Sequence, residues 1–117
     1  MIRLYHTTHL KLLPSILRRG LETRRDRRGH GRIWLHTYSQ TIWAVRHLAG
    51  AHKWHLDEMW TLRVERPRYL ITRNRRGIWY TEEDIPRSFI SHDSICLECG
   101  VWEPPNEDTL NLSLIHI

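Results

Sequence analysis

Tyr5-His6-Thr7-Thr8 places an imidazole beside two hydroxyl groups near the start of the chain. Imidazole nitrogens donate or accept hydrogen bonds, so this combination suits recognition of a sugar hydroxyl or a carboxamide. A histidine here can equally cap the turn that follows. The motif marks a candidate site and leaves its role open.

A second candidate lies in IWLHTYS, residues 33–39. If this segment is a strand, Trp34 and His36 share one face, while Leu35 and Thr37 share the other. An aromatic surface and an imidazole would then be presented together. Tryptophan is also a frequent core residue, so both interpretations of Trp34 stay open.

Arginine supplies almost all of the positive charge. The formal net charge is +5, and Lys11 and Lys53 are the only lysines. Guanidinium groups bind phosphate oxygens through paired hydrogen bonds and stack on bases, which favours an anionic partner. A nucleic acid or a phosphate-rich cofactor would fit the clusters RRDRR and RNRR. The alternative explanation is a GC-rich genome and an ordinary solvated surface.

Two pairs of residues could bind zinc, His52 with His55 and Cys96 with Cys99, with His92 in reserve. The pairs lie far apart in an unfamiliar order, so we predict no metal site. The sequence also contains no GxSxG, no HExxH and no Gly-rich phosphate loop.

The elements that would carry these residues follow from apolar spacing. A strand over 2–6 leads into a helix that begins near Pro14 and stops at Gly20. After an exposed basic loop, a strand over 33–37 leads into a helix capped by Ser39. We expect the buried face of this second helix to include Ile42, Trp43 and Leu48.

Strands alone follow in the second half of the chain. Alternation of Trp60, Leu62 and Val64 with polar residues predicts a half-buried strand. Shorter strands are expected over 69–72, 78–81 and 88–92, with a turn at RNRRG. This order predicts an α+β domain with a mostly antiparallel sheet.

One domain over residues 1–97 is expected, followed by a loosely packed tail over 98–117. The ending LSLIHI resembles translated sequencing-adapter read-through from metagenomic contigs. With no long apolar run and no signal-peptide layout, we expect a cytoplasmic protein without a membrane partner. Cys96 and Cys99 would then be free thiols. The sequence does not indicate an oligomeric state.

Three segments in order resemble the ADP-ribosyltransferase superfamily. LYHTTHLKLLPSILRRGL is similar to the start of the DarT-like DNA ADP-ribosyltransferase toxins. RIWLHTYSQTIWAV resembles the second superfamily motif, and RRGIWYTEEDIPRSFI resembles the ending of KptA-type RNA 2′-phosphotransferases. The resemblance covers about residues 2–90. It implies split antiparallel sheets with two to three helices, and NAD bound as co-substrate in a cleft between them.

Carried over residue by residue, the resemblance implies a triad of His6, Trp34 and Ile78. His6 would bind the NAD ribose or nicotinamide amide, and Trp34 would pack beside the nicotinamide. Arginines would hold phosphates, with Arg73 and Arg75 as catalytic candidates and Arg18 as a further clamp. The remaining implied cofactor-binding residues are Tyr5, Thr7, Thr8, His36 and Ser39.

The third position is glutamate in most of the superfamily and apolar in the phosphotransferases. A glutamate there grips the ribose and offsets developing positive charge, which Ile78 cannot do; Glu82 or Glu83 would serve only in another register. An RNA 2′-phosphate acceptor needs no general base and is held by arginines.

The resemblance thus implies a transferase that moves ADP-ribose to a nucleic-acid or phosphate acceptor. The alternatives are a non-catalytic nucleic-acid-binding module on the same fold and an interaction protein from a phage or toxin-antitoxin locus.

Overall fold

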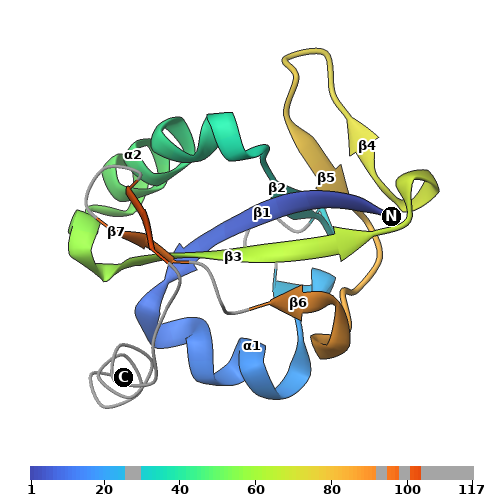
Figure 1. The fold of residues 1–117 in the computed structure, drawn as a ribbon, viewed down its shortest axis with the longest axis horizontal. Helices are drawn as coiled ribbons and strands as arrows, with labels where there is room; N and C mark the ends of the chain where they lie inside the picture. The colour runs from blue at the N-terminus through green and yellow to red at the C-terminus, as the bar shows by residue number, and fades with distance from the viewer. Residues whose placement is uncertain (26–29, 92–94, 98–100, 104–117) are drawn as a thin grey trace.

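The computed structural model describes residues 1–25, 30–91, 95–97 and 101–103, and it shows an α+β fold (Figure 1). Its described part contains two α-helices and two antiparallel sheets of three strands each, so the predicted class is confirmed. A further antiparallel pair joins β7 (Ile95–Leu97) to β8 (Val101–Glu103). Regular backbone structure therefore continues beyond residue 97, where the sequence placed the start of a loose tail.

The first sheet contains the longest strands. In spatial order its strands are β1 (Ile2–His9), β3 (Met59–Arg66) and β6 (Ile90–Ser91). His6 pairs with Leu62, and Thr7 pairs with Thr61. Side chains alternate along a strand, so His6 points to the face of Leu4 and Thr8, whereas Tyr5, Thr7 and His9 point to the other.

The second sheet is shorter. In spatial order its strands are β2 (Ile33–Leu35), β5 (Trp79–Thr81) and β4 (Thr72–Arg73). The predicted turn between β4 and β5 is present: Asn74 Oδ1 accepts from the backbone N–H groups of Arg76 and Ile78, both at 2.9 Å. Gly77 adopts φ 78° in this turn, a conformation that glycine tolerates best.

The two sheets meet at the free edge of β1. Tyr5 N–H donates to the His36 carbonyl and His36 N–H donates to the Tyr5 carbonyl, each at 2.8 Å. A second bridge pairs Leu21 with Ile85. The chain immediately after β2 is thus fixed against β1 at the residue before His6.

Helix α1 (Leu13–Arg19) follows β1 with Pro14 in its first turn, as expected. It stops at Gly20, which has φ 78° and lies so close to the Ile85 carbonyl that a Cβ atom would collide with it. Short 3₁₀ turns connect several elements: Leu10–Leu12, Thr23–Arg25, Tyr38–Gln40, Leu56–Glu58, Arg68–Leu70 and Arg87–Phe89.

Helix α2 (Thr41–His52) begins later than predicted, after the 3₁₀ turn Tyr38–Gln40. Thr37 caps this 3₁₀ turn, where Gln40 Oε1 accepts from Thr37 N–H at 2.9 Å in a capping box. The N-cap of α2 itself is Gln40, not Ser39. Ser39 lies exposed inside the turn.

The expected buried face of α2 was wrong for Ile42 and Trp43, which are 45% and 49% exposed. Leu48 is half-buried and packs against the buried pair Val45 and Met59, as expected. Smaller side chains face the first sheet instead: Thr41, Ala44, Val45 and Ala49. Small residues let the helix approach the sheet closely, which apolar spacing alone did not reveal.

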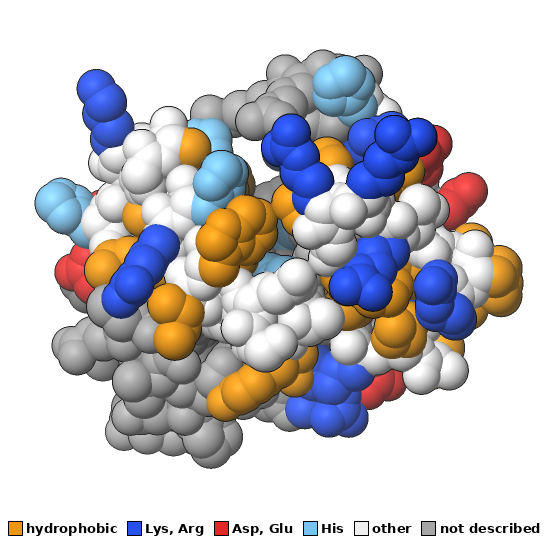
Figure 2. Space-filling model, turned by 90° about the horizontal axis from the view of Figure 1, so that it is seen from above, with side chains coloured by type: hydrophobic (Ala, Val, Ile, Leu, Met, Phe, Trp, Pro, Cys, Tyr) orange, Lys and Arg blue, Asp and Glu red, His pale blue; other side chains and the backbone are white. Residues whose placement is uncertain are grey.

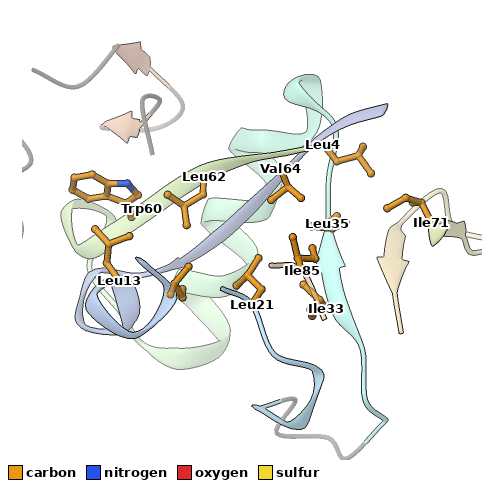
Figure 3. Close-up of a cluster of buried hydrophobic side chains, with 11 residues drawn as sticks. Leu4, Leu13, Leu21, Ile33, Leu35, Trp60, Leu62, Val64, Ile71 and Ile85 are labelled. Carbon is orange, nitrogen blue, oxygen red and sulfur yellow. The ribbon is translucent and has the colours of Figure 1, made fainter. Parts of the chain in front are cut away.

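The main core lies between α1, the first sheet and the second sheet (Figure 3). Leu62 and Val64 are almost completely buried there, as the alternation along β3 predicted, and Leu13 of α1 is buried with them. Leu35 and Ile33 contribute from β2, and Ile85 closes the far side. Burying such side chains is the main stabilising contribution to the fold, and it fixes the two sheets at their junction.

Candidate functional site

His6 lies beside the junction of the two sheets, half-buried. Its Nδ1–H donates to the backbone carbonyl of Trp34 at 2.8 Å, since a carbonyl can only accept. In the neutral ring Nε2 therefore carries a lone pair. Within the described part of the chain nothing donates to this nitrogen. It is available to accept a hydrogen bond from a bound hydroxyl or amide.

His36 is held in the same tautomer by a buried chain of hydrogen bonds. Its Nδ1–H donates to the Thr37 carbonyl at 2.9 Å, so its Nε2 accepts from the Thr7 hydroxyl at 2.7 Å. The Thr7 oxygen in turn accepts from the Thr61 hydroxyl at 2.9 Å. The chain ties the end of β2 to both long strands of the first sheet.

Both imidazoles are kept neutral. Burial lowers the pKa of His6, and the hydrogen bond to the Trp34 carbonyl only partly opposes this effect. Burial likewise lowers the pKa of His36 to about 4, with the Thr37 carbonyl opposing and the charge of protonated His6 adding to the effect.

Trp34 contributes its backbone to His6, while its ring lies elsewhere. The indole packs on Tyr80, with 5.3 Å between ring centroids, and the Arg32 guanidinium lies 5.8 Å from it. Arg32 also covers Tyr80 at 4.3 Å. Trp34 alternates with the buried residues Ile33 and Leu35, so its ring faces the opposite side of the second sheet. The structure joins Trp34 to His6 through a carbonyl.

The other expected cofactor residues divide between the two faces of β1. Thr8 is buried on the side of His6. Tyr5 lies on the opposite side, where its ring stacks on His36 at 6.2 Å and meets the edge of Tyr38 at 5.9 Å. The Thr7 hydroxyl is already used in the buried hydrogen bonds to His36 and Thr61. Ser39 lies on the exposed surface of the same region, 3.1 Å from the Thr37 hydroxyl.

Ile78 lies half-buried where the β4–β5 turn joins β5. The turn is tied to the start of α2 because Gln40 Nε2 donates to the Gly77 carbonyl at 3.2 Å. Glu82 and Glu83 follow β5 as exposed residues, and Glu82 lies 4.0 Å from Arg32. Neither Glu82 nor Glu83 therefore occupies the position of Ile78 at the start of β5.

The arginines occupy two separate places. Arg73 and Arg75 are exposed on the β4–β5 hairpin, where the Arg73 guanidinium covers Trp79 at 5.5 Å. Arg18 lies on α1, which Figure 1 shows across the first sheet from the hairpin. Arg18 therefore does not join the hairpin arginines.

Figure 2 shows how these parts frame one face of the molecule. The view looks down on α2 at the left and the β4–β5 hairpin at the right, with Lys and Arg side chains on both sides. The surface is hollowed between them, and a histidine side chain is visible in the hollow. The candidate binding site is the junction beside His6, where β1 is the edge strand of the first sheet.

Sequence reasoning missed His9, at the far end of β1. Its Nδ1 accepts from Lys11 N–H at 3.0 Å, so its Nε2–H donates to Glu58 at 3.0 Å. The ring also meets the edge of Trp54 at 4.8 Å. The expected strand stopped at His6, although the alternation of Tyr5, Thr7 and His9 extends it. These contacts make His9 a structural residue.

The residues offered as alternative zinc ligands are engaged elsewhere or lie outside the described side chains. His52 stacks on Trp54 with 4.1 Å between centroids, and His55 N–H donates to Glu58. His92, Cys99 and the side chain of Cys96 lie outside the described part. Among described residues, no three His, Cys, Asp or Glu side chains gather as a metal site would require.

Comparison of the chain with protein families, with curated proteins and with solved structures gives no match. The candidate site therefore stands on its own geometry. None of the helices in the described part is both long enough and apolar enough to cross a membrane.

Proposed function

We propose that the chain has an ADP-ribosyltransferase-like fold and binds NAD beside His6, with ADP-ribose passing to a phosphate-bearing or nucleic-acid acceptor. One observation carries the proposal: at the junction of two small antiparallel sheets, the Trp34 carbonyl holds His6 with Nε2 free to accept. A ribose hydroxyl or a carboxamide N–H is a suitable donor to that nitrogen.

His6 and the arginines of the hairpin have the chemistry that a dinucleotide co-substrate requires. A neutral acceptor at His6 suits the ribose hydroxyls, and Arg73 and Arg75 on the hairpin suit the pyrophosphate. The Thr7 to His36 hydrogen bond positions the backbone beside His6 without needing to touch the ligand. NAD would supply a ribosyl centre activated by the departure of nicotinamide.

Ile78 favours an anionic acceptor. An apolar side chain at this position neither accepts a proton nor offsets positive charge, so a hydroxyl or amine acceptor would lack a general base there. A phosphate oxygen is already a nucleophile and needs only to be held. The exposed hairpin arginines can provide that contact.

Ile78 also favours a second candidate function, that of a non-catalytic nucleic-acid-binding module. In that case the arginine-rich face would bind an oligonucleotide in a salt-sensitive way, without turnover of NAD. Growth inhibition on expression, or relief from it, independent of His6 would instead point to an interaction protein of a toxin-antitoxin or phage locus.

Transfer is tested with NAD labelled in its adenylate phosphate. Purified protein is incubated with RNA, with RNA bearing a 2′-phosphate, with DNA and with protein acceptors. We expect label to appear on a nucleic acid or phosphate acceptor, and to be lost in His6→Ala. The matched control is His30→Ala, which removes an exposed histidine. Label confined to protein, or equal labelling by His6→Ala, would contradict the proposal.

A further inference from the structure

The outward face of α2 exposes unusually large apolar side chains. Trp43 and Ile42 are 49% and 45% exposed, and Tyr38, just before the helix, is 56% exposed. Leaving large aromatic side chains in water forgoes the stabilisation that burial would give. Clustered exposure of this kind marks an interaction surface.

The Trp43 ring is held in one orientation by its neighbour. The imidazole of His47, one turn later, stacks on it with 5.2 Å between centroids and 14° between planes. Such a stack covers one face of the indole and leaves an area on the other side for a further planar group. An aromatic ring held in this way loses little side-chain entropy when a base stacks on it.

The surrounding charge is positive. Helix α2 carries Arg46 and no acidic residue, and the β4–β5 hairpin carries Arg73, Arg75 and Arg76 and no acidic residue. Figure 2 shows both elements on one face, with acidic side chains only toward its margins. The Gln40 to Gly77 hydrogen bond ties the two elements together. This charge pattern complements a polyanion.

We infer that this face binds a single-stranded nucleic acid, with a base stacked on Trp43 and the phosphates held by the hairpin arginines. The inference deepens the proposed function and rests on its acceptor class. Stacking requires an unpaired base whose face is accessible, so a single strand fits and a duplex does not. The strand would cross the hollow between α2 and the hairpin that Figure 2 shows.

Binding is measured without NAD, by fluorescence anisotropy with short labelled DNA and RNA strands of the same sequence. We expect Trp43→Ala to weaken binding roughly tenfold and Trp43→Phe to restore most of it, because stacking contributes about 1–3 kcal/mol per base. The matched control is Ile42→Ala, which truncates an equally exposed apolar neighbour. Little change is expected there, since an aliphatic side chain cannot replace a ring in stacking.

The arginine contribution is measured by salt dependence. Arg75 and Arg76 are exposed, and replacing both with alanine should reduce the slope of log affinity against log salt by about 1.4, close to 0.7 for each lost phosphate contact. Tighter binding of RNA or of DNA would identify which strand is the natural ligand. Circular dichroism checks that each variant is folded.

Three results would overturn the inference: equal affinity for duplex and single strand, unchanged affinity in Trp43→Ala, or a concentration-dependent dimer abolished by Trp43→Ala without strand binding. The last result would show that the face binds a second copy. Calorimetry with NAD on the same variants separates the proposals, because Trp43→Ala should leave NAD affinity unchanged while His6→Ala removes it.

Discussion

His6 and His36 are held as neutral imidazoles by backbone carbonyls at the junction of the two sheets. In each ring the Nδ1 proton is fixed, which determines what Nε2 can do. For His36 that nitrogen is consumed by Thr7, whereas for His6 it remains available within the described structure. Two histidines in the same tautomer therefore have different roles, one structural and one suited to binding a ligand.

The burial of His36 predicts a pH-dependent stability. Its pKa falls from the usual 6.5 to about 4 in the folded chain, so between these values the unfolded chain binds more protons. Acidification from pH 6.5 to pH 4 should therefore destabilise the fold, by on the order of 3 kcal/mol from His36. His6 shifts in the same direction and adds to the loss.

Nuclear magnetic resonance titration of the imidazole protons measures this directly, alongside urea unfolding across the same pH range. The His36 signals should move near pH 4, well below the usual range of a histidine. Titration of His36 near the usual 6.5, or stability that does not fall on acidification, would contradict the buried hydrogen bonds of His36.

At the scale of elements, the end of α1 shows how close packing fixes one helix against the segment that follows β5. Gly20 has φ 78°, and a Cβ atom there would collide with the Ile85 carbonyl. The sequence predicted the stop at this glycine. It did not reveal that the backbone of the segment after β5 lies against it, because that contact joins distant parts of the chain.

Gly20→Ala should lower the free energy of unfolding by about 2 kcal/mol or more, from positive-φ strain and the collision together. Gly50→Ala is the matched control, since Gly50 lies within α2 with open space around it. That substitution should stabilise the chain by about 0.5–1 kcal/mol. Urea unfolding measures both, and an equal effect of the two would contradict the close approach at Gly20.

Helix α2 shows where element-level prediction failed. Apolar spacing selected Ile42 and Trp43 for the buried side, but the helix packs through Ala44, Val45 and Ala49. Hydrophobicity alone cannot distinguish a large residue that fills a core from one displayed for a partner. Trp43, which was wrongly predicted to be buried, lies on the surface that we propose to bind nucleic acid.

For the whole molecule, the order of helices and strands was predictable from the sequence. The way in which the two sheets join was not. Local periodicity predicted the α+β class and the long strand β3. The bridge between Tyr5 and His36 depends on which strand edges meet, and local spacing carries no such information. The sequence therefore predicted which residues form the candidate site, His6 and Trp34 among them, but not how they contact one another. Their contact through a backbone carbonyl emerged only from the three-dimensional structure.

The arrangement makes β1 the central element of the molecule. His6 lies on one side of this strand, and Thr7, with its hydrogen bond to His36, lies on the other. The residue after β2, His36, pairs with the edge of β1 at Tyr5. The hairpin and α2 lie on either side of the hollow that Figure 2 shows. His6 lies where the two sheets meet, which is where we propose that NAD binds.

Isothermal titration calorimetry with NAD tests this central claim most directly, on the unmodified chain and on His6→Ala, with His30→Ala as control. The account predicts saturable binding that His30→Ala retains and His6→Ala loses. Absence of binding at millimolar NAD, or equal binding by His6→Ala, would contradict it.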